Sequence, residues 1–242
     1  MELEAIANRI DHALLHPTLT DAELRDGCAA AVRAGVACVC VKPFHVPLAA
    51  EALASGSRTV VGTVVGFPHG ANPIAVKCFE TEHAAARGAR EIDAVVNIGK
   101  VLSEDWEYLH SEIAALTAAC RDLRVTLKVI LESGYLPSTP LKVRLCEMCA
   151  DLGAQYVKTS TGFGFTRTST GSYEPFGATD DDIKLMVATV GARARVKASG
   201  GIRSLDDFLR VVRLGAHRVG TSATVAILRE ARERATAAAA IG

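Results

Sequence analysis

Three lysines lie inside apolar stretches whose composition is typical of buried strands: Lys128 in TLKVILE, Lys158 in YVKTST and Lys197 in RVKASGG. A charged side chain within a buried strand costs free energy unless it is paired or used in function. The lysines of an ordinary exposed surface do not account for this placement. We therefore ask first what buried amines, above all Lys158 and Lys197, can do chemically.

Lys158 and Lys197 lie on what we count as the sixth and seventh strands, and small residues follow each of them. Neighbouring inward-pointing ammonium groups repel each other, and burial also disfavours the charged form. An unperturbed lysine, with a pKa of about 10.4, is neutral in only about one part in 2,500 at pH 7. Lowering that pKa by about three units takes about 4 kcal/mol. The pattern favours one lysine that attacks a carbonyl and another that stays charged and tunes it.

Two acidic residues also lie within apolar runs. Asp93 in EIDAVVN is placed to accept and return protons during Schiff-base formation. The alternative is a salt network at the centre of the fold, in which Asp93 and Glu132 neutralise the lysine pair. Asp11 in RIDHALL has the same two interpretations, and we count it as a candidate substrate-binding residue.

Glycine turns follow the last two predicted strands. Gly200-Gly201 comes just before a helix start at Ser204, and Gly220-Thr221-Ser222 comes just before another helix. Backbone N–H groups in such turns, together with a helix N-terminus, are a common phosphate site in α/β barrels. The alternative use of these glycines is to make tight corners between strand and helix. A phosphate held there would lie beside the two lysines, which predicts a phosphorylated carbonyl substrate.

Eight β-branched runs alternate with helical segments along the chain, and they must position these groups. Runs that are apolar almost throughout are typical of parallel strands covered on both faces. The alternation favours one α/β domain over residues 1–242, a closed (β/α)₈ TIM barrel with its active site at the C-terminal ends of the strands. An open doubly wound sheet is the alternative, but no G-x-G-x-x-G follows the first strand. The predicted strands span residues 9–15, 36–41, 59–67, 91–97, 126–132, 156–161, 195–201 and 217–222.

Helix-start signals recur between these runs. A side-chain oxygen before the first turn accepts a hydrogen bond from a free helix N–H, and proline suits the first turn because it has no N–H to satisfy. These signals support the alternation of strand and helix. The predicted starts are Thr20 with Glu23, Asn72 with Pro73, Thr139 with Pro140, Thr179 with Asp182, and Ser204 with Asp207.

Composition excludes several classes of protein. The formal net charge is zero, so nothing attracts the chain as a whole to nucleic acid or acidic membranes. No run approaches the length of a bilayer span and the first residues are not signal-like, so we expect a cytoplasmic protein. Seven cysteines, an odd number, argue against a disulfide framework. Cys146 and Cys149 share one face of a helical pattern and are expected to pack inward, while Cys40 is either a buried, inert thiol or one that reactive aldehydes trap.

The segments that carry these residues resemble the 2-deoxyribose-5-phosphate aldolases, class I aldolases of barrel fold. VKTSTGF around Lys158, VKASGGIR around Lys197 and EIDAVVNIG around Asp93 form a specific combination. The resemblance covers nearly the whole chain in the family's order. Its other segments are IDHALL, VCVKPFHV, TVVGFPHG, LKVILESG and RVGTSA.

The resemblance implies reversible cleavage of 2-deoxyribose 5-phosphate to glyceraldehyde 3-phosphate and acetaldehyde. It implies that Lys158 forms the Schiff base, that Lys197 depresses the pKa of Lys158, and that Asp93 transfers protons with water. It also implies a homodimer and no cofactor or metal, because the iminium accepts the electrons. The residues that would hold the 5-phosphate are Gly162, Gly200, Gly201, Gly220 and Ser222.

Three departures from the family pattern stand out. Ala13 replaces a common threonine, which puts one hydroxyl contact in doubt, and Lys42 replaces a common asparagine. Residues 163–178 form a longer segment than in many members, either a lid or rim over the site or a solvated insertion. Three other functions remain open: a Schiff-base aldolase for another sugar phosphate, a phosphate-binding isomerase or synthase without covalent catalysis, and a non-catalytic sugar-phosphate binding protein.

Overall fold

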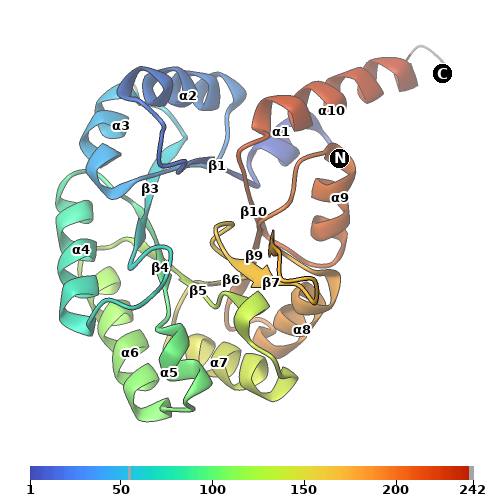
Figure 1. Ribbon diagram of the computed structural model, residues 1–242. Coiled ribbons are helices and arrows are strands. Elements are labelled where there is room, and N and C mark those ends of the chain that lie inside the picture. Colours follow the sequence, from blue (N-terminus) through green and yellow to red (C-terminus); the bar gives the residue numbers. More distant parts are fainter. Residues whose placement is uncertain (54–55, 240–242) are drawn as a thin grey trace.

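In the computed structural model, which describes residues 1–53 and 56–239, eight parallel strands close into a barrel (Figure 1). Their order around the barrel is β1-β10-β9-β6-β5-β4-β3-β2. The TIM barrel and all eight predicted strands are therefore confirmed, and the open sheet is wrong. The strands are β1 (Ile10–Leu14), β2 (Cys38–Val41), β3 (Val60–Val65), β4 (Glu91–Val95), β5 (Thr126–Ile130), β6 (Tyr156–Lys158), β9 (Arg195–Ser199) and β10 (Arg218–Thr221).

Helices surround the barrel on its outside (Figure 1). None of the helices in the described ranges combines the length and the apolar character that a membrane crossing needs. The α-helices are α1 (Leu3–Ala7), α2 (Asp21–Ala34), α3 (Val46–Ala52), α4 (Ile74–Ala86), α5 (Ile98–Leu102), α6 (Trp106–Asp122), α7 (Thr139–Asp151), α8 (Asp180–Val190), α9 (Leu205–Arg213) and α10 (Thr224–Ala239). Two short 3₁₀ turns, η1 (Pro43–His45) and η2 (Ser133–Tyr135), follow β2 and β5.

The core lies between the strands and the helices. Strands β2 and β4 are buried along their whole length, as expected for strands covered on both faces. On α6 the buried residues Leu109, Ile113, Leu116 and Cys120 recur at helical spacing and face the barrel. Cys146 and Cys149 are fully buried free thiols on α7, which confirms the prediction that they pack inward.

Most helix starts follow the predicted capping residues. Thr20 with Glu23 and Ser204 with Asp207 form complete capping boxes, and the Thr179 side chain accepts a hydrogen bond from the N–H of Asp182. Helix α7 begins at Thr139, with Pro140 in its first turn. The expected start at Asn72 is wrong as a cap, because α4 begins at Ile74 and the Asn72 amide donates to Glu80 instead.

Residues 163–178 contain a hairpin that the sequence patterns did not predict. Strands β7 (Phe165–Arg167) and β8 (Tyr173–Pro175) pair antiparallel and are exposed along their length. The ring of Phe176 packs edge-on against Tyr135, with centroids 4.7 Å apart. The hairpin therefore leaves the barrel after β6 and is anchored where it returns, beside the end of β5 (Figure 1).

Candidate active site

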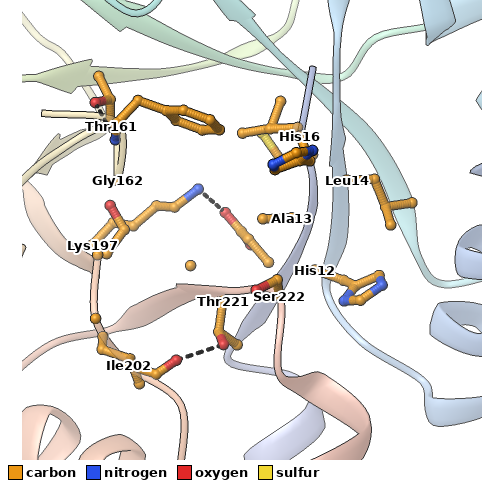
Figure 2. A pocket seen from close by; sticks show the side chains of 18 of the residues that line it. His12, Ala13, Leu14, His16, Thr161, Gly162, Lys197, Ile202, Thr221 and Ser222 are labelled. Atoms are coloured by element: carbon orange, nitrogen blue, oxygen red, sulfur yellow. Dashed lines mark hydrogen bonds and ion pairs between the residues drawn. The ribbon is translucent and has the colours of Figure 1, made fainter. Parts of the chain in front are cut away.

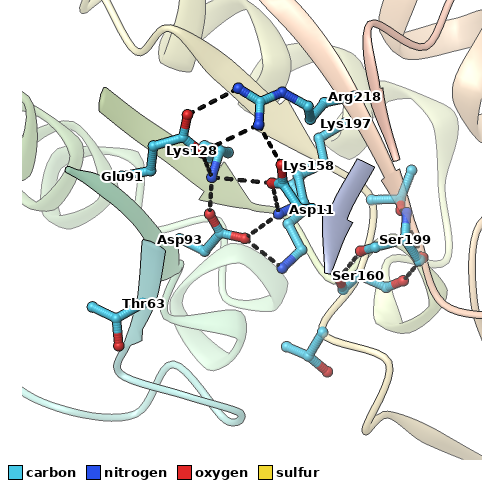
Figure 3. Close-up of polar contacts among 12 residues, drawn as sticks. Asp11, Thr63, Glu91, Asp93, Lys128, Lys158, Ser160, Lys197, Ser199 and Arg218 are labelled. Atoms are coloured by element: carbon cyan, nitrogen blue, oxygen red, sulfur yellow. Dashed lines mark hydrogen bonds and ion pairs between the residues drawn. The ribbon is translucent and has the colours of Figure 1, made fainter. Parts of the chain in front are cut away.

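Closure of the barrel brings the three predicted catalytic residues together. Lys158 on β6 is the direct register partner of Lys197 on β9, and both side chains are buried inside the barrel. The Nζ atoms of Lys158 and Lys197 each lie 2.7 Å from the same oxygen, Oδ2 of Asp93 (Figure 3). One carboxylate on β4 thus joins two amines from adjacent strands.

A wider ion network lies beneath this trio. Lys128 donates to Oδ1 of Asp93 at 2.6 Å and lies 2.7 Å from Glu91, while Lys197 lies 2.5 Å from Asp11 (Figure 3). Arg218 pairs with Asp11 and, at 2.9 Å, with Glu91. In this network four cations therefore face three carboxylates.

Part of the predicted salt network is therefore present, but with different members. Glu132 hydrogen-bonds to the backbone N–H of Thr161, not to a lysine, so its predicted place in the network is wrong. Lys128 lies within an apolar run, and the sequence pattern predicts no role for it. Arg218 and Glu91 carried no sequence signal beyond a charged residue at the start of a strand.

Contacts with carboxylates shift the pKa values of the two lysines in opposite directions. Burial lowers the pKa of Lys158, the ammonium of Lys197 lowers it further, and Asp93 opposes both, so the net pKa is below its usual value. Burial also disfavours the charged form of Lys197, but Asp11 and Asp93 outweigh it and raise the pKa of that lysine. Lys197 is therefore a stable ammonium ion, and Lys158 is the amine that loses its proton more easily.

Asp93 is held in its ionised form. Burial alone would raise the pKa of this carboxyl group, but Lys128, Lys158 and Lys197 together bring it well below its usual value. Asp11 shows the same balance, and its pKa is also lowered. The Asp93 carboxylate therefore forms an ionic hydrogen bond with the Lys158 amine, at 2.7 Å.

A cavity of about 420 Å³ opens above the lysines at the C-terminal ends of the strands. Lys158, Lys197 and Asp11 lie at its base, whereas Asp93 lies beneath and is not part of the lining. In Figure 2, Gly162 and Lys197 lie on one side and Ala13 and His16 on the other. All the residues predicted to bind phosphate line this cavity: Gly162, Gly200, Gly201, Gly220 and Ser222.

The glycines on one wall of the cavity are required by geometry. Gly200 has φ of 92°, and a Cβ there would lie 2.7 Å from the Cα of Gly177. At Gly220 a Cβ would lie 2.9 Å from the Cβ of Ser199 and 3.2 Å from Cε of Lys197, closer than such atoms normally approach. Arg203 also lines this part of the cavity. Sequence reasoning missed it, although it closes the VKASGGIR segment.

One patch of the cavity wall is apolar. Leu15, Cys40 and Phe163 line it, and Ala13 packs against the same cluster. Burial raises the pKa of Cys40 to about 11, so its thiol stays protonated. An apolar wall beside Lys158 contributes to the burial that disfavours its charged form.

Lys42 organises a loop at the mouth of the cavity. Its ammonium group donates to the carbonyl oxygens of His16, Pro17 and Leu19 at 3.0, 3.2 and 3.0 Å. His16 and Leu19 line the cavity. Lys42 therefore holds a loop that forms part of the cavity wall.

One group of side chains has the composition of a metal site. Asp11, Cys38 and Glu91 offer ligand atoms within 4.8 Å of one another. Both carboxylates are already paired with Lys128 and Arg218. Burial, with the nearby Glu91 and Asp11, raises the pKa of Cys38 well above its usual value, so the thiol keeps its proton. This donor set fits an ion-paired core better than a metal ion.

Comparisons with known proteins agree with this geometry. Residues 5–233 match the DeoC/LacD family aldolase model. The chain is 45% identical to the deoxyribose-phosphate aldolase of Clostridium perfringens over 94% of this chain and 96% of that one, and 43% identical to that of Rhodopirellula baltica over 95% and 90%. A structure described as the unique tetrameric structure of deoxyribose phosphate aldolase from Aeropyrum pernix superposes with a TM-score of 0.82 at 29% identity, covering 96% of this chain and 92% of that one. The chain therefore belongs to the DeoC/LacD family of aldolases and, within it, to the deoxyribose-phosphate aldolases.

Proposed function

We propose that the protein reversibly cleaves 2-deoxy-D-ribose 5-phosphate to D-glyceraldehyde 3-phosphate and acetaldehyde through a Schiff base on Lys158. The observation that carries this proposal is the pair of adjacent buried lysines with opposite pKa shifts. Both lysines form ion pairs with Asp93. A lysine can attack a carbonyl carbon only as the neutral amine, and only Lys158 of this pair has a lowered pKa. The named relatives support the choice of substrate.

The first half of the reaction forms the iminium. Asp93 accepts a proton from the Lys158 ammonium group, and the neutral amine attacks C1 of the open-chain sugar to give a carbinolamine. The proton then returns, with the help of a water molecule, to the departing hydroxyl group, which leaves as water. The ammonium of Lys197 stays in place and disfavours reprotonation of Lys158 by repulsion.

The second half breaks the carbon–carbon bond. The iminium withdraws the electron pair of the C2–C3 bond while the C3 hydroxyl loses its proton, through water, to Asp93. Glyceraldehyde 3-phosphate leaves and an enamine remains on Lys158. Protonation of that enamine at C2, followed by addition of water, releases acetaldehyde and restores the free amine.

The substrate phosphate is proposed to lie on the glycine side of the cavity. Gly200 and Gly201 lead to α9, and Ser222 lies two residues before α10. Backbone N–H groups and helix N-termini attract anions, and Arg203 adds a positive charge to the same side. The apolar patch of Leu15, Cys40 and Phe163 suits the carbon end of the donor aldehyde.

Borohydride reduction tests the covalent step. The protein is incubated with acetaldehyde, reduced, digested and analysed by mass spectrometry. We expect an adduct on Lys158 and unmodified peptides containing Lys128 and Lys197. Lys158→Leu is the matched control, and it should give no adduct and no turnover. A wild-type protein without an adduct would leave a phosphate-binding isomerase or synthase as the better explanation.

Three further measurements address the substrate, the turnover and the assembly. Steady-state rates with acetaldehyde and with dihydroxyacetone as donor separate the proposed reaction from an aldolase for another sugar phosphate, and we expect acetaldehyde to be preferred. Retro-aldol turnover rules out a protein that only binds sugar phosphates. We also propose a homodimer, which light scattering on the purified protein tests.

A further inference from the structure

Glu132, which follows β5, is a buried carboxylate on a strained backbone. Its φ and ψ are 52° and 54°, in the left-handed region that residues with a Cβ seldom adopt. Its exposed fraction is 1%. Residues held in such conformations gather at functional sites, where the surrounding structure imposes them. The contacts of Glu132 should therefore indicate which function its strained conformation supports.

Those contacts extend the pairing of β5 with β6 beyond the strand ends. The backbone N–H groups on either side of Glu132 donate to the carbonyl oxygens of Lys158 and Thr159, each at 2.9 Å. Both carboxylate oxygens of Glu132 then accept from the N–H of Thr161, each at 3.1 Å. The side chain thus continues, by one more bond, a ladder that the backbone has already formed.

The loop that carries Glu132 is itself fixed from the other side. The hydroxyl of Ser133, the next residue, donates to Asp182 at 2.9 Å, and Lys142 donates to the same carboxylate at 2.7 Å. Asp182 lies in the first turn of α8. Glu132 therefore projects from a firmly held base toward the turn after β6.

That turn forms part of the cavity wall. Thr161 and Gly162 line the cavity, and the Thr161 hydroxyl accepts from the N–H of Phe163 at 3.0 Å, which closes the turn. Gly162 lies beside Gly200, since a Cβ on Gly162 would be 3.9 Å from the Cα of Gly200. The residues that Glu132 holds are thus on the glycine side of the cavity.

We propose that Glu132 is a positioning residue for the phosphate end of the substrate. Its carboxylate holds the N–H of Thr161, and through it sets Gly162 against Gly200. Glu132 is not among the residues that line the cavity, so it acts through this turn and not on the reacting atoms. This inference rests on the function proposed above, which places a phosphate on the glycine side.

Substrates with and without phosphate provide the test. Glu132→Leu removes the acceptor, whereas Glu132→Gln keeps an oxygen within reach of Thr161. We expect Glu132→Leu to raise KM for 2-deoxyribose 5-phosphate about tenfold, the size of effect expected for loss of one hydrogen bond to a charged acceptor. Cleavage of unphosphorylated 2-deoxyribose and borohydride trapping of acetaldehyde on Lys158 should stay close to wild type. Glu132→Gln should recover most of the lost affinity.

Two more variants protect the test against effects of folding and strain. Glu132→Gly removes the acceptor while relieving the left-handed backbone, and it should reproduce the rise in KM even if Glu132→Leu is unstable. Glu104→Leu is the matched control, because Glu104 also has a positive φ, of 53°, but lies exposed between α5 and α6. It should leave KM unchanged.

One set of outcomes would overturn the positioning role of Glu132, and a different outcome would overturn the proposed Schiff-base reaction. Equal losses with phosphorylated and unphosphorylated substrates, or no recovery with Glu132→Gln, would show that Glu132 does not act on the phosphate end. Wild-type protein that forms no borohydride adduct on Lys158 would instead reject the Schiff-base reaction itself.

Discussion

Replacing Lys197 with leucine tests the electrostatic difference between the two lysines. The Nζ atoms of Lys158 and Lys197 each lie 2.7 Å from one oxygen of Asp93, so they are at most about 5.4 Å apart. Two unit charges at about 5 Å and an effective dielectric constant of about 20 repel by about 3 kcal/mol. That energy corresponds to about two pKa units. Removing Lys197 also leaves Asp93 freer to stabilise the Lys158 ammonium ion.

Both effects raise the pKa of Lys158 in the Lys197→Leu variant. A higher pKa means that the amine is neutral only at higher pH, so activity should fall at neutral pH and recover in part as the pH rises. We expect the acidic limb of kcat/KM for 2-deoxyribose 5-phosphate to move up by about two pH units, with about a hundredfold loss on that limb.

The assay is the pH profile of kcat/KM, corrected for the fraction of active protein. That correction is needed because Asp11 and Asp93 lose a buried partner, which can destabilise the fold by about 3–5 kcal/mol. Borohydride trapping counts competent sites, and circular dichroism reports folding. Lys197→Arg keeps the charge and should keep the acidic limb near its wild-type position. An unmoved acidic limb in correctly folded Lys197→Leu would refute the tuning role.

Three other substitutions have expected outcomes. Ser222→Asp places a negative charge beside the proposed phosphate, and should raise KM for the phosphorylated substrate by about tenfold while sparing unphosphorylated 2-deoxyribose in the same steady-state assay. Lys128→Met leaves Asp93 and Glu91 with fewer partners in the buried network, and should lower the free energy of unfolding by about 3–5 kcal/mol in urea titrations. Lys42→Met removes the donor to three carbonyl groups of residues 16–19, and should speed hydrogen exchange there and raise KM by roughly two- to fivefold with kcat almost unchanged.

For each of these substitutions, one result would contradict the expected role of the residue. Equal loss with both sugars in Ser222→Asp would place the phosphate elsewhere. Unchanged unfolding of Lys128→Met would mean that the remaining cations satisfy the carboxylates. Lys42→Met with wild-type hydrogen exchange in residues 16–19 would show that the loop does not depend on the ammonium group.

The strands were predictable because burial on both faces leaves a strong local signal. In a chain with regularly spaced helix starts, a run such as VACVCV is typical of a buried strand, and β2 lies within it. Helix caps were predictable for a similar reason, since Thr20 and Ser204 satisfy free N–H groups only three residues away. The hairpin of β7 and β8 was missed because its residues are exposed and lack an apolar pattern.

The candidate site was predictable only in part. Lys158 and Lys197 were conspicuous because a lysine in a buried strand is costly, and the glycine turns because they follow the last two strands. Arg203 and Arg218 are charged residues near strand ends, where a solvated side chain is equally common. Glu132 was assigned to the wrong partner because its backbone conformation, which turns the side chain toward Thr161, has no signal in residue type.

The sequence by itself determined the eight barrel strands, most of the helix starts and the burial of Lys158, Lys197 and Asp93, because each of these depends on neighbours a few positions away. Tertiary structure decided the partners. Asp93 meets Lys158 and Lys197 across 65 and 104 positions of the chain, and only strand register and barrel closure bring them within bonding distance. The opposite pKa shifts of the two lysines follow from that closure, because they depend on how many carboxylates each buried amine meets in space.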